Sequence, residues 1–206
     1  MKKYILILIA LFGFTAFGQT IKPIETEWTL HYSEQNDTYF KDVNNVLDKF
    51  VGTWRYEDLT TNTVFEVTFS KILHQEAHKN GSKDMLSAQF KLIINNVEQY
   101  NTYTTPCVNC FVPVGFSSFL ESSDALGNFV TSEVSPNMYI GAMAEPEFER
   151  NVSASDLKLR YMPSLLGDSP TLLWVNRVSE VSLYTTGERI NNYATPLEMV
   201  LTKVED

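Results

Sequence analysis

The stretch YFKDVNNVLDKFVGTWRYEDL (residues 39–59) changes its hydrophobic period halfway along. Its first half has the i, i+3, i+4, i+7 spacing of one apolar helix face, made by Val43, Val46, Leu47 and Phe50. Asp42 can cap such a helix, and Gly52 can end it, because glycine tolerates the backbone conformation found just past a helix. The stretch therefore predicts one short helix that runs into a strand at Gly-Thr-Trp.

After Gly52 apolar and polar residues alternate, which is the pattern of strands with one buried face. The alternating apolar residues are Phe65, Val67 and Phe69, and then Leu86, Ala88, Phe90, Leu92 and Ile94. Asn95-Asn96 fits a hairpin turn, since Asn tolerates positive φ, and Thr60-Thr61-Asn62 predicts an earlier turn.

Later strands are predicted over residues 97–104, 128–133, 138–142, 156–162, 171–178 and 196–204. The Pro-, Ser- and Gly-rich stretch 105–136 predicts long loops. Many short strands with a single helix indicate an all-β fold, either a closed antiparallel barrel or a sandwich.

The N-terminus has the features of a signal peptide. Lys2 and Lys3 precede an apolar run that is too short to span a bilayer, and Ala16 and Gly18 supply the small side chains of a cleavage site. We expect cleavage after Gly18 and an exported protein, either periplasmic or extracellular, without a membrane span. Residues 19–38 show no clear periodicity and are interpreted as an N-terminal arm, and 39–206 as one domain.

Charge argues against a nucleic-acid partner. The chain has 16 Lys and Arg against 25 Asp and Glu, a net charge of −9, and loss of Lys2 and Lys3 with the leader lowers it to −11. Binding to phosphates needs clustered basic residues, so neither nucleic acid nor an anionic membrane surface is expected as a partner.

A short helix followed by Gly-x-Trp on the first strand resembles the start of a lipocalin barrel. The resemblance implies that Gly52 allows a tight bend, that Trp54 plugs the barrel floor and that Lys203, near the chain end, lies across the indole. DKFVGTW also resembles the intracellular fatty-acid-binding proteins, but their helical lid and Arg-x-Tyr clamp have no counterpart here. The implied fold is a lipocalin-like up-and-down β-barrel of about eight to ten strands.

A wider resemblance connects three blocks: residues 39–56, Asn95-Asn96-Val97-Glu98 and residues 196–203. Together with the leader they look like an uncharacterised family of secreted lipocalin-like proteins from Bacteroidota-type bacteria. This resemblance implies a fold and an envelope or extracellular setting, and no activity.

Cys107 and Cys110 are the two cysteines of the chain. A Cys-x-x-Cys redox site opens a helix in a βαβ unit, whereas this pair lies between Thr-Thr-Pro and Phe-Val-Pro, which suit loop and strand. The prediction is a local disulfide in an oxidising compartment. A closed zinc site with His74 and His78 is the alternative, but residues i and i+4 meet on a helix and this stretch reads as strand and turn.

No cofactor is expected, and other catalytic or metal motifs are weak. Glu145, Glu147 and Glu149 alternate along one strand face, which could gather calcium but is explained more simply by a solvated face. No nucleophile elbow or phosphate loop appears, and His31, like His74 and His78, lacks a catalytic setting. An enzyme built on buried paired carboxylates stays open, without residues to assign to it.

Two other functions are favoured over an enzyme. The first is a binding module for a small apolar molecule, for which the candidate ligand-binding residues are Trp54, Tyr56, Phe65, Phe69 and Phe90. The same residues could instead fill a dry core. The second is then a structural protein that acts through its loops and surface on an envelope or secreted partner.

Overall fold

The structure, a computed structural model, describes residues 19–29, 36–76, 81–105, 111–123, 129–143, 155–164, 168–177 and 194–204. These residues form eleven strands and one 3-10 helix: β1 (Thr20–Pro23), η1 (Ile24–Thr29), β2 (Thr38–Lys41), β3 (Gly52–Asp58), β4 (Thr63–Glu76), β5 (Ser82–Ile94), β6 (Val97–Asn101), β7 (Phe111–Ser123), β8 (Phe129–Met143), β9 (Ser155–Met162), β10 (Thr171–Arg177) and β11 (Glu198–Lys203). The predicted all-β class is confirmed.

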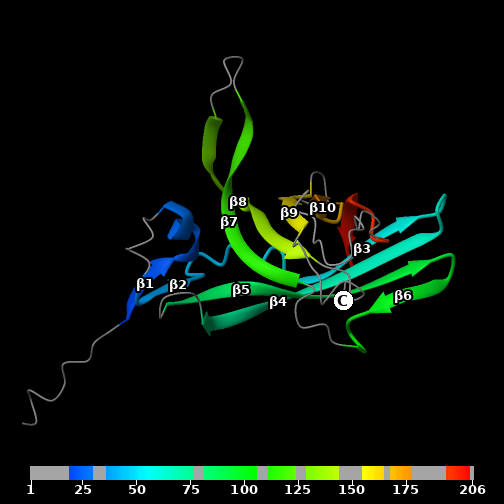
Figure 1. Cartoon of the computed structure of the whole chain (residues 1–206), viewed down its shortest axis with the longest axis horizontal. Coiled ribbons are helices and arrows are strands. Elements are labelled where there is room, and N and C mark those ends of the chain that lie inside the picture. The colour runs from blue at the N-terminus through cyan, green and yellow to red at the C-terminus, as the bar shows by residue number, and fades with distance from the viewer. Residues whose placement is uncertain are drawn as a thin grey trace, which may run out of the picture.

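All strands belong to one sheet, in the order β1-β2-β5-β4-β3-β11-β10-β9-β8-β7, with β6 beside β5. The β3–β4 and β5–β6 hairpins lie at one end of the molecule, and β1, β2 and η1 gather at the other (Figure 1). In chain order β3 is the first strand of the antiparallel part and β11 is the last, and these two strands pair with each other. The N-terminal strands differ, because β1 with β2 and β2 with β5 run parallel.

The predicted closed barrel is not what the structure shows. One edge of β5 pairs with β4, and the opposite edge is shared by β2, at Ser82 and Lys83, and by β6, from Lys91 onward. Between these two pairings β5 lies close to β7, and the described residues form no strand ladder there. The Leu86 N–H instead donates to the Tyr139 hydroxyl at 3.2 Å. The sheet is therefore curled and mixed, with a seam between β5 and β7.

The hairpin predictions are confirmed. Gly52 to Asp58 pair with Phe69 to Thr63, and Asn62, Asn95 and Asn96 take φ values of 53°, 53° and 62°. These left-handed values are the ones a tight hairpin turn requires. The predicted inward phase is also correct, since Phe65, Val67, Phe69, Leu86, Phe90 and Leu92 are all buried.

The predicted helix over residues 43–50 is absent. Residues 42–51 form consecutive turns with i→i+3 hydrogen bonds such as Phe50 N to Leu47 O, at 3.0 Å. Asn45 has φ 53°, which interrupts right-handed helix, and the Asp42 carboxylate accepts the backbone N–H groups of Val46 and Leu47. Asp42 caps this segment as predicted, but what it caps is a set of turns.

One further region differs from expectation. The stretch predicted to form loops contains β7 and the start of β8, which make the long hairpin that projects in Figure 1. Much of the predicted N-terminal arm is ordered as β1, η1 and β2 against the rest of the sheet. The signal peptide prediction lies outside the described residues.

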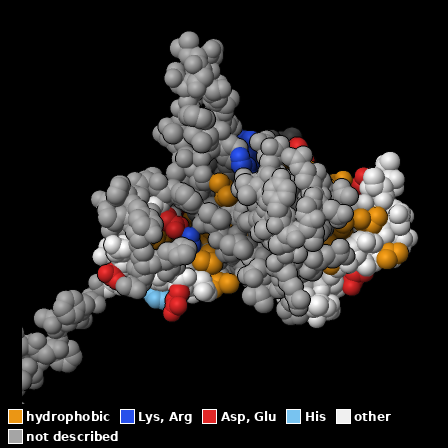
Figure 2. Space-filling model, in the orientation of Figure 1, with side chains coloured by type: hydrophobic (Ala, Val, Ile, Leu, Met, Phe, Trp, Pro, Cys, Tyr) orange, Lys and Arg blue, Asp and Glu red, His pale blue; other side chains and the backbone are white. Residues whose placement is uncertain are grey.

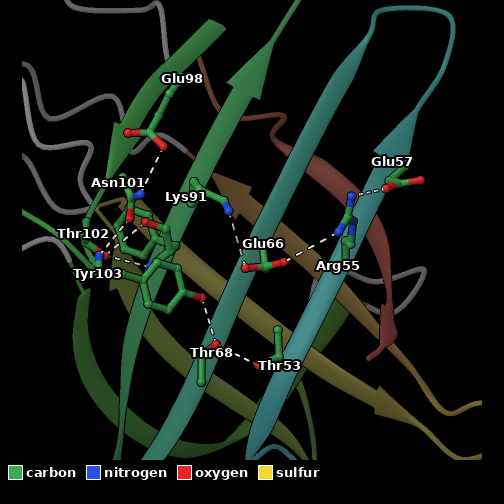
Figure 3. Close-up of polar contacts among 11 residues, drawn as sticks. Thr53, Arg55, Glu57, Glu66, Thr68, Lys91, Glu98, Asn101, Thr102 and Tyr103 are labelled. Atoms are coloured by element: carbon green, nitrogen blue, oxygen red, sulfur yellow. Dashed lines mark hydrogen bonds and ion pairs between the residues drawn. The ribbon is translucent and has the colours of Figure 1, made fainter. Parts of the chain in front are cut away.

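The two faces of the sheet separate apolar from polar side chains. The outer face of β3 to β5 carries linked polar groups, drawn in Figure 3: Glu66 lies between Arg55 and Lys91, and Thr68 bonds both Thr53 and Tyr103. These groups satisfy one another on the solvent side. The inner face holds the apolar core, and it is the face on which an apolar ligand would bind.

Candidate functional site on the inner face of the sheet

One end of the interior is built around Trp54. Its indole is fully buried, and its Nε1–H donates to the Phe50 carbonyl at 2.7 Å. The Lys203 ammonium lies 5.4 Å from the ring centroid, within the range of a cation–π contact. The structure thus brings together the residues that the lipocalin resemblance assigned to this end.

Gly52 is required beside this pair. Its φ is +111°, a value that side chains rarely adopt, and an added Cβ would come within 3.1 Å of Lys203 Cε. The glycine therefore provides both the backbone conformation and the space through which the lysine reaches the indole.

All five residues predicted to bind ligand face inward. Trp54, Phe65, Phe69 and Phe90 are at most 1 % exposed, and Tyr56 is partly buried against the same core. Several of these rings touch other aromatic rings; Phe69, for example, meets Phe111 with centroids 5.8 Å apart. Much of the predicted aromatic lining thus packs against other aromatic rings of the core.

A chain of aromatic contacts crosses the other half of the interior. The ring centroids of Tyr100 and Phe90, which meet edge-on, are 5.6 Å apart. The centroids of Phe90 and Phe65 are 6.2 Å apart, and those of Phe65 and Trp174 are 5.2 Å apart. The Tyr100 hydroxyl is hydrogen-bonded to the buried Thr195 hydroxyl. This chain of contacts leads from β6 across the sheet to β10.

Trp174 and Asn176 stand out because their buried polar atoms have no partners. Both side chains are at most 1 % exposed, and neither the indole Nε1 nor the amide Nδ2 and Oδ1 atoms form a hydrogen bond among the described residues. A buried polar group that is left unpaired costs about 1–3 kcal/mol. Native interiors contain few such groups, so two on one strand face call for a functional explanation.

Sequence reasoning missed these two residues, although their signal was present. Leu172, Trp174 and Asn176 alternate along the predicted strand 171–178, and this phase puts the asparagine on the apolar side. An amide in phase with a leucine and a tryptophan is the pattern that identifies a buried polar group.

A second group of polar residues, the Asp84 cluster (Tyr39, Asp42, Lys71, His74 and Asp84), connects β2, β4 and β5 around the buried side chains of Asp42 and Asp84. Asp84 Oδ1 accepts the Tyr39 hydroxyl at 2.6 Å and the His74 backbone N–H at 3.0 Å, and Oδ2 accepts the Asp42 N–H at 2.9 Å. His74 has φ 55° and lies at an irregularity in the β4–β5 register. Lys71 Nζ lies 2.8 Å from Asp42 Oδ2.

The Asp84 cluster is internally satisfied. Burial acts to raise the pKa of the Asp84 carboxyl, but the hydrogen bonds from Tyr39, Asp42 and His74 and the Lys71 charge outweigh burial and lower that pKa. Burial and the bond to Asp84 raise the pKa of Tyr39 to about 12. With its carboxylate oxygens already occupied, the cluster serves to join strands.

Other predicted site residues lie outside the described part of the chain: Cys107, Cys110, His31, His78, Glu145, Glu147 and Glu149. The disulfide stays a prediction. Within the described ranges no three His, Cys, Asp or Glu side chains gather as metal ligands. Nor is any described helix long and apolar enough to cross a membrane.

Comparison with known proteins gives one match. A family model, described as a family of unknown function (DUF6705), matches residues 1–117, a range that ends within β7 and includes two of the three blocks on which the resemblance rests. No curated protein and no solved structure matches the chain.

Proposed function

The chain belongs to the DUF6705 family, whose function is unknown, and we propose that it is an exported, lipocalin-like binding module for a small, mainly apolar molecule. The binding site is the inner face of the curled sheet, between the Trp54 end and β10.

One observation carries this proposal: the buried side chain of Asn176 has no hydrogen-bond partner among the described residues. A protein that only needs a filled core gains nothing from an unpaired amide, because an apolar residue of the same shape would avoid its desolvation cost. A binding protein does gain, because an amide in an apolar setting fixes the orientation of a ligand.

The inner face suits such a ligand. The side chains around β10 that face inward are apolar or aromatic, among them Phe65, Leu157, Leu172 and Met199. Small-molecule sites typically combine such a lining with a few polar groups. Trp54 and Lys203 would close one end, as in the barrels that the sequence resembles.

Native mass spectrometry of protein purified from the producing cells or their medium tests the proposal. We expect a reproducible mass above that of the chain, which disappears after extraction with organic solvent. The same sample measured under denaturing conditions is the control, because it reports covalent additions. A bare native mass in every preparation would contradict the proposal.

Exposed apolar side chains favour a second function, a structural or interaction protein. Leu59 is 90 % exposed and Val97 59 % exposed, in or beside the turns of the β3–β4 and β5–β6 hairpins. Figure 2 shows hydrophobic side chains at the end of the molecule where these hairpins lie.

Cross-linking in intact cells with wild type and with the double variant Leu59→Ser/Val97→Ser tests this function. Loss of a cross-linked partner in the variant would support it, and an unchanged pattern would exclude this surface.

A further inference from the structure

We propose that Asn176 and Trp174 are the polar anchor of the interior site and select an uncharged ligand carrying an amide-like group, a carbonyl beside an N–H. This inference rests on the proposed function and adds the chemical class of the ligand.

The two residues point to the same side of the sheet. They lie at alternate positions of β10, so their side chains emerge on one face about 7 Å apart. The Asn176 backbone N–H donates to the Leu197 carbonyl at 2.7 Å, which fixes the strand at this position. Backbone pairing therefore holds the anchor in place, while the side-chain polar atoms of Trp174 and Asn176 have no hydrogen-bond partner among the described residues.

The unpaired atoms define what they can bind. The Asn176 amide offers an acceptor and a donor side by side in one plane, and the Trp174 indole offers one further donor. A ligand amide or lactam can pair with Asn176 through two parallel hydrogen bonds, its carbonyl accepting and its N–H donating. A second acceptor on the ligand, about one strand repeat away, would meet Trp174.

The surroundings favour an uncharged ligand. Across the ladder, Asn176 is opposite Leu157, and Trp174 is opposite Leu159 and Met199, all of them buried. An ion without a counter-charge in such a setting is disfavoured far more than a neutral amide. Lys203 is engaged with Trp54, and the partly buried Lys71 and Lys83 are paired with carboxylates, Lys71 with Asp42 and Lys83 with Glu27.

The test compares matched probes in matched variants. Dissociation constants are measured by calorimetry for hexanamide, octanamide and decanamide and for the methyl esters of the corresponding acids, which keep the carbonyl but lack the N–H. The proteins are solvent-extracted wild type, Asn176→Leu, Trp174→Phe and a control on the opposite face of the same strand, Leu173→Met. Thermal unfolding confirms that each variant is folded.

The quantity of interest is the ester-to-amide ratio of dissociation constants. We expect Asn176→Leu to lower this ratio by about tenfold or more, because the amide N–H loses its acceptor while the ester loses less. Trp174→Phe should leave the ratio unchanged for these probes, because they carry no second acceptor for the indole N–H. Leu173→Met, which does not face the interior, should leave the ratio unchanged.

The possible negative results distinguish the proposed anchor from the proposed binding module. Amide and ester binding with the same ratio in wild type and Asn176→Leu would overturn the anchor and leave the binding module standing. A co-purified ligand without an amide-like group would do the same. No binding of any probe, together with a bare native mass, would overturn both and leave an amide bonded only to internal water.

Discussion

Lys203 and Trp54 are direct partners across the β11–β3 pairing, and the lysine ammonium lies 5.4 Å from the indole centroid. This contact joins the last strand of the chain to the first strand after the turns of residues 42–51. A residue of β11 thus covers Trp54, the residue on which one end of the interior is built.

Trp54→Ala should destabilise the protein by about 3–5 kcal/mol, because a fully buried aromatic side chain is removed and its space cannot refill. Urea unfolding measures the change. Leu59→Ala, at a position 90 % exposed, is the control and should change stability by less than about 0.5 kcal/mol. A loss below about 1 kcal/mol for Trp54→Ala would contradict the role of the indole.

Gly52→Ala should cost about 1–3 kcal/mol, since the position has φ +111° and the new methyl group would crowd Lys203. A double-mutant cycle with Lys203→Ala separates the two causes. The second change should recover the part of the loss due to crowding and leave the part due to the backbone. Equal stability of wild type and Gly52→Ala would argue against both.

Asp84→Asn should make the protein less sensitive to acid. The pKa of Asp84 is lowered in the folded state, so its contribution is complete above the unfolded pKa, near 3.9, and is lost as pH falls through the folded value. Urea unfolding between about pH 7 and pH 3 should therefore show a shallower loss in the variant. The variant should also be about 2 kcal/mol less stable at neutral pH, because bonds to a charged acceptor are weakened.

Tyr39→Phe should change the alkaline limb of the stability curve. The pKa of Tyr39 is about 12, raised from 10, so the neutral hydroxyl supports folding below pH 10 and that support is lost as pH rises toward 12. Wild type should lose stability across this window more steeply than the variant, as followed by chemical unfolding. Parallel curves would show that the pKa of Tyr39 is not raised in the folded protein.

Asn176→Leu should raise the free energy of unfolding by about 1 kcal/mol, since it replaces an unpaired buried amide by an apolar side chain of similar size. Differential scanning calorimetry on solvent-extracted protein measures it, with Asn62→Leu as a contrasting variant. Asn62 has φ 53° in a hairpin turn, so leucine there should destabilise. A clear loss of stability in Asn176→Leu would mean that the amide is satisfied inside the protein.

Local patterns predicted well where the ladder is regular. Phe65 to Phe69 and Leu86 to Leu92 alternate without interruption, and Asn95-Asn96 specifies its turn by chemistry alone. β7 was missed because its pairing with β8 shifts register repeatedly between Pro113 and Ser123, which breaks the period-two signal. The helix prediction failed at Asn45, where a left-handed residue interrupts an apolar spacing that turns satisfy equally well.

The site was harder to predict than the sheet. The Trp54–Lys203 contact could be anticipated from a resemblance, since both residues stand in recognisable blocks. The parallel pairing of β2 with β5 brings together segments about forty residues apart and leaves no periodic trace in the sequence. The significance of Asn176 depends on what surrounds its side chain, which becomes visible only once β9, β10 and β11 are placed side by side.

If the interior holds a ligand, as proposed, the seam between β5 and β7 is the place where the described strands can part without breaking a ladder. Parting β3 from β4, or β9 from β10, would break a continuous ladder. Along the middle of β5 the described residues form no ladder, and the contacts described there include the bond between Leu86 and Tyr139 and the ring contact between Phe69 and Phe111. Opening there exposes the interior at a small fraction of the energy of unfolding. The rates at which the proposed ligand binds and dissociates would then depend on how often the strands separate along this seam. Replacement of Tyr139 would change these two rates more than the affinity for the ligand.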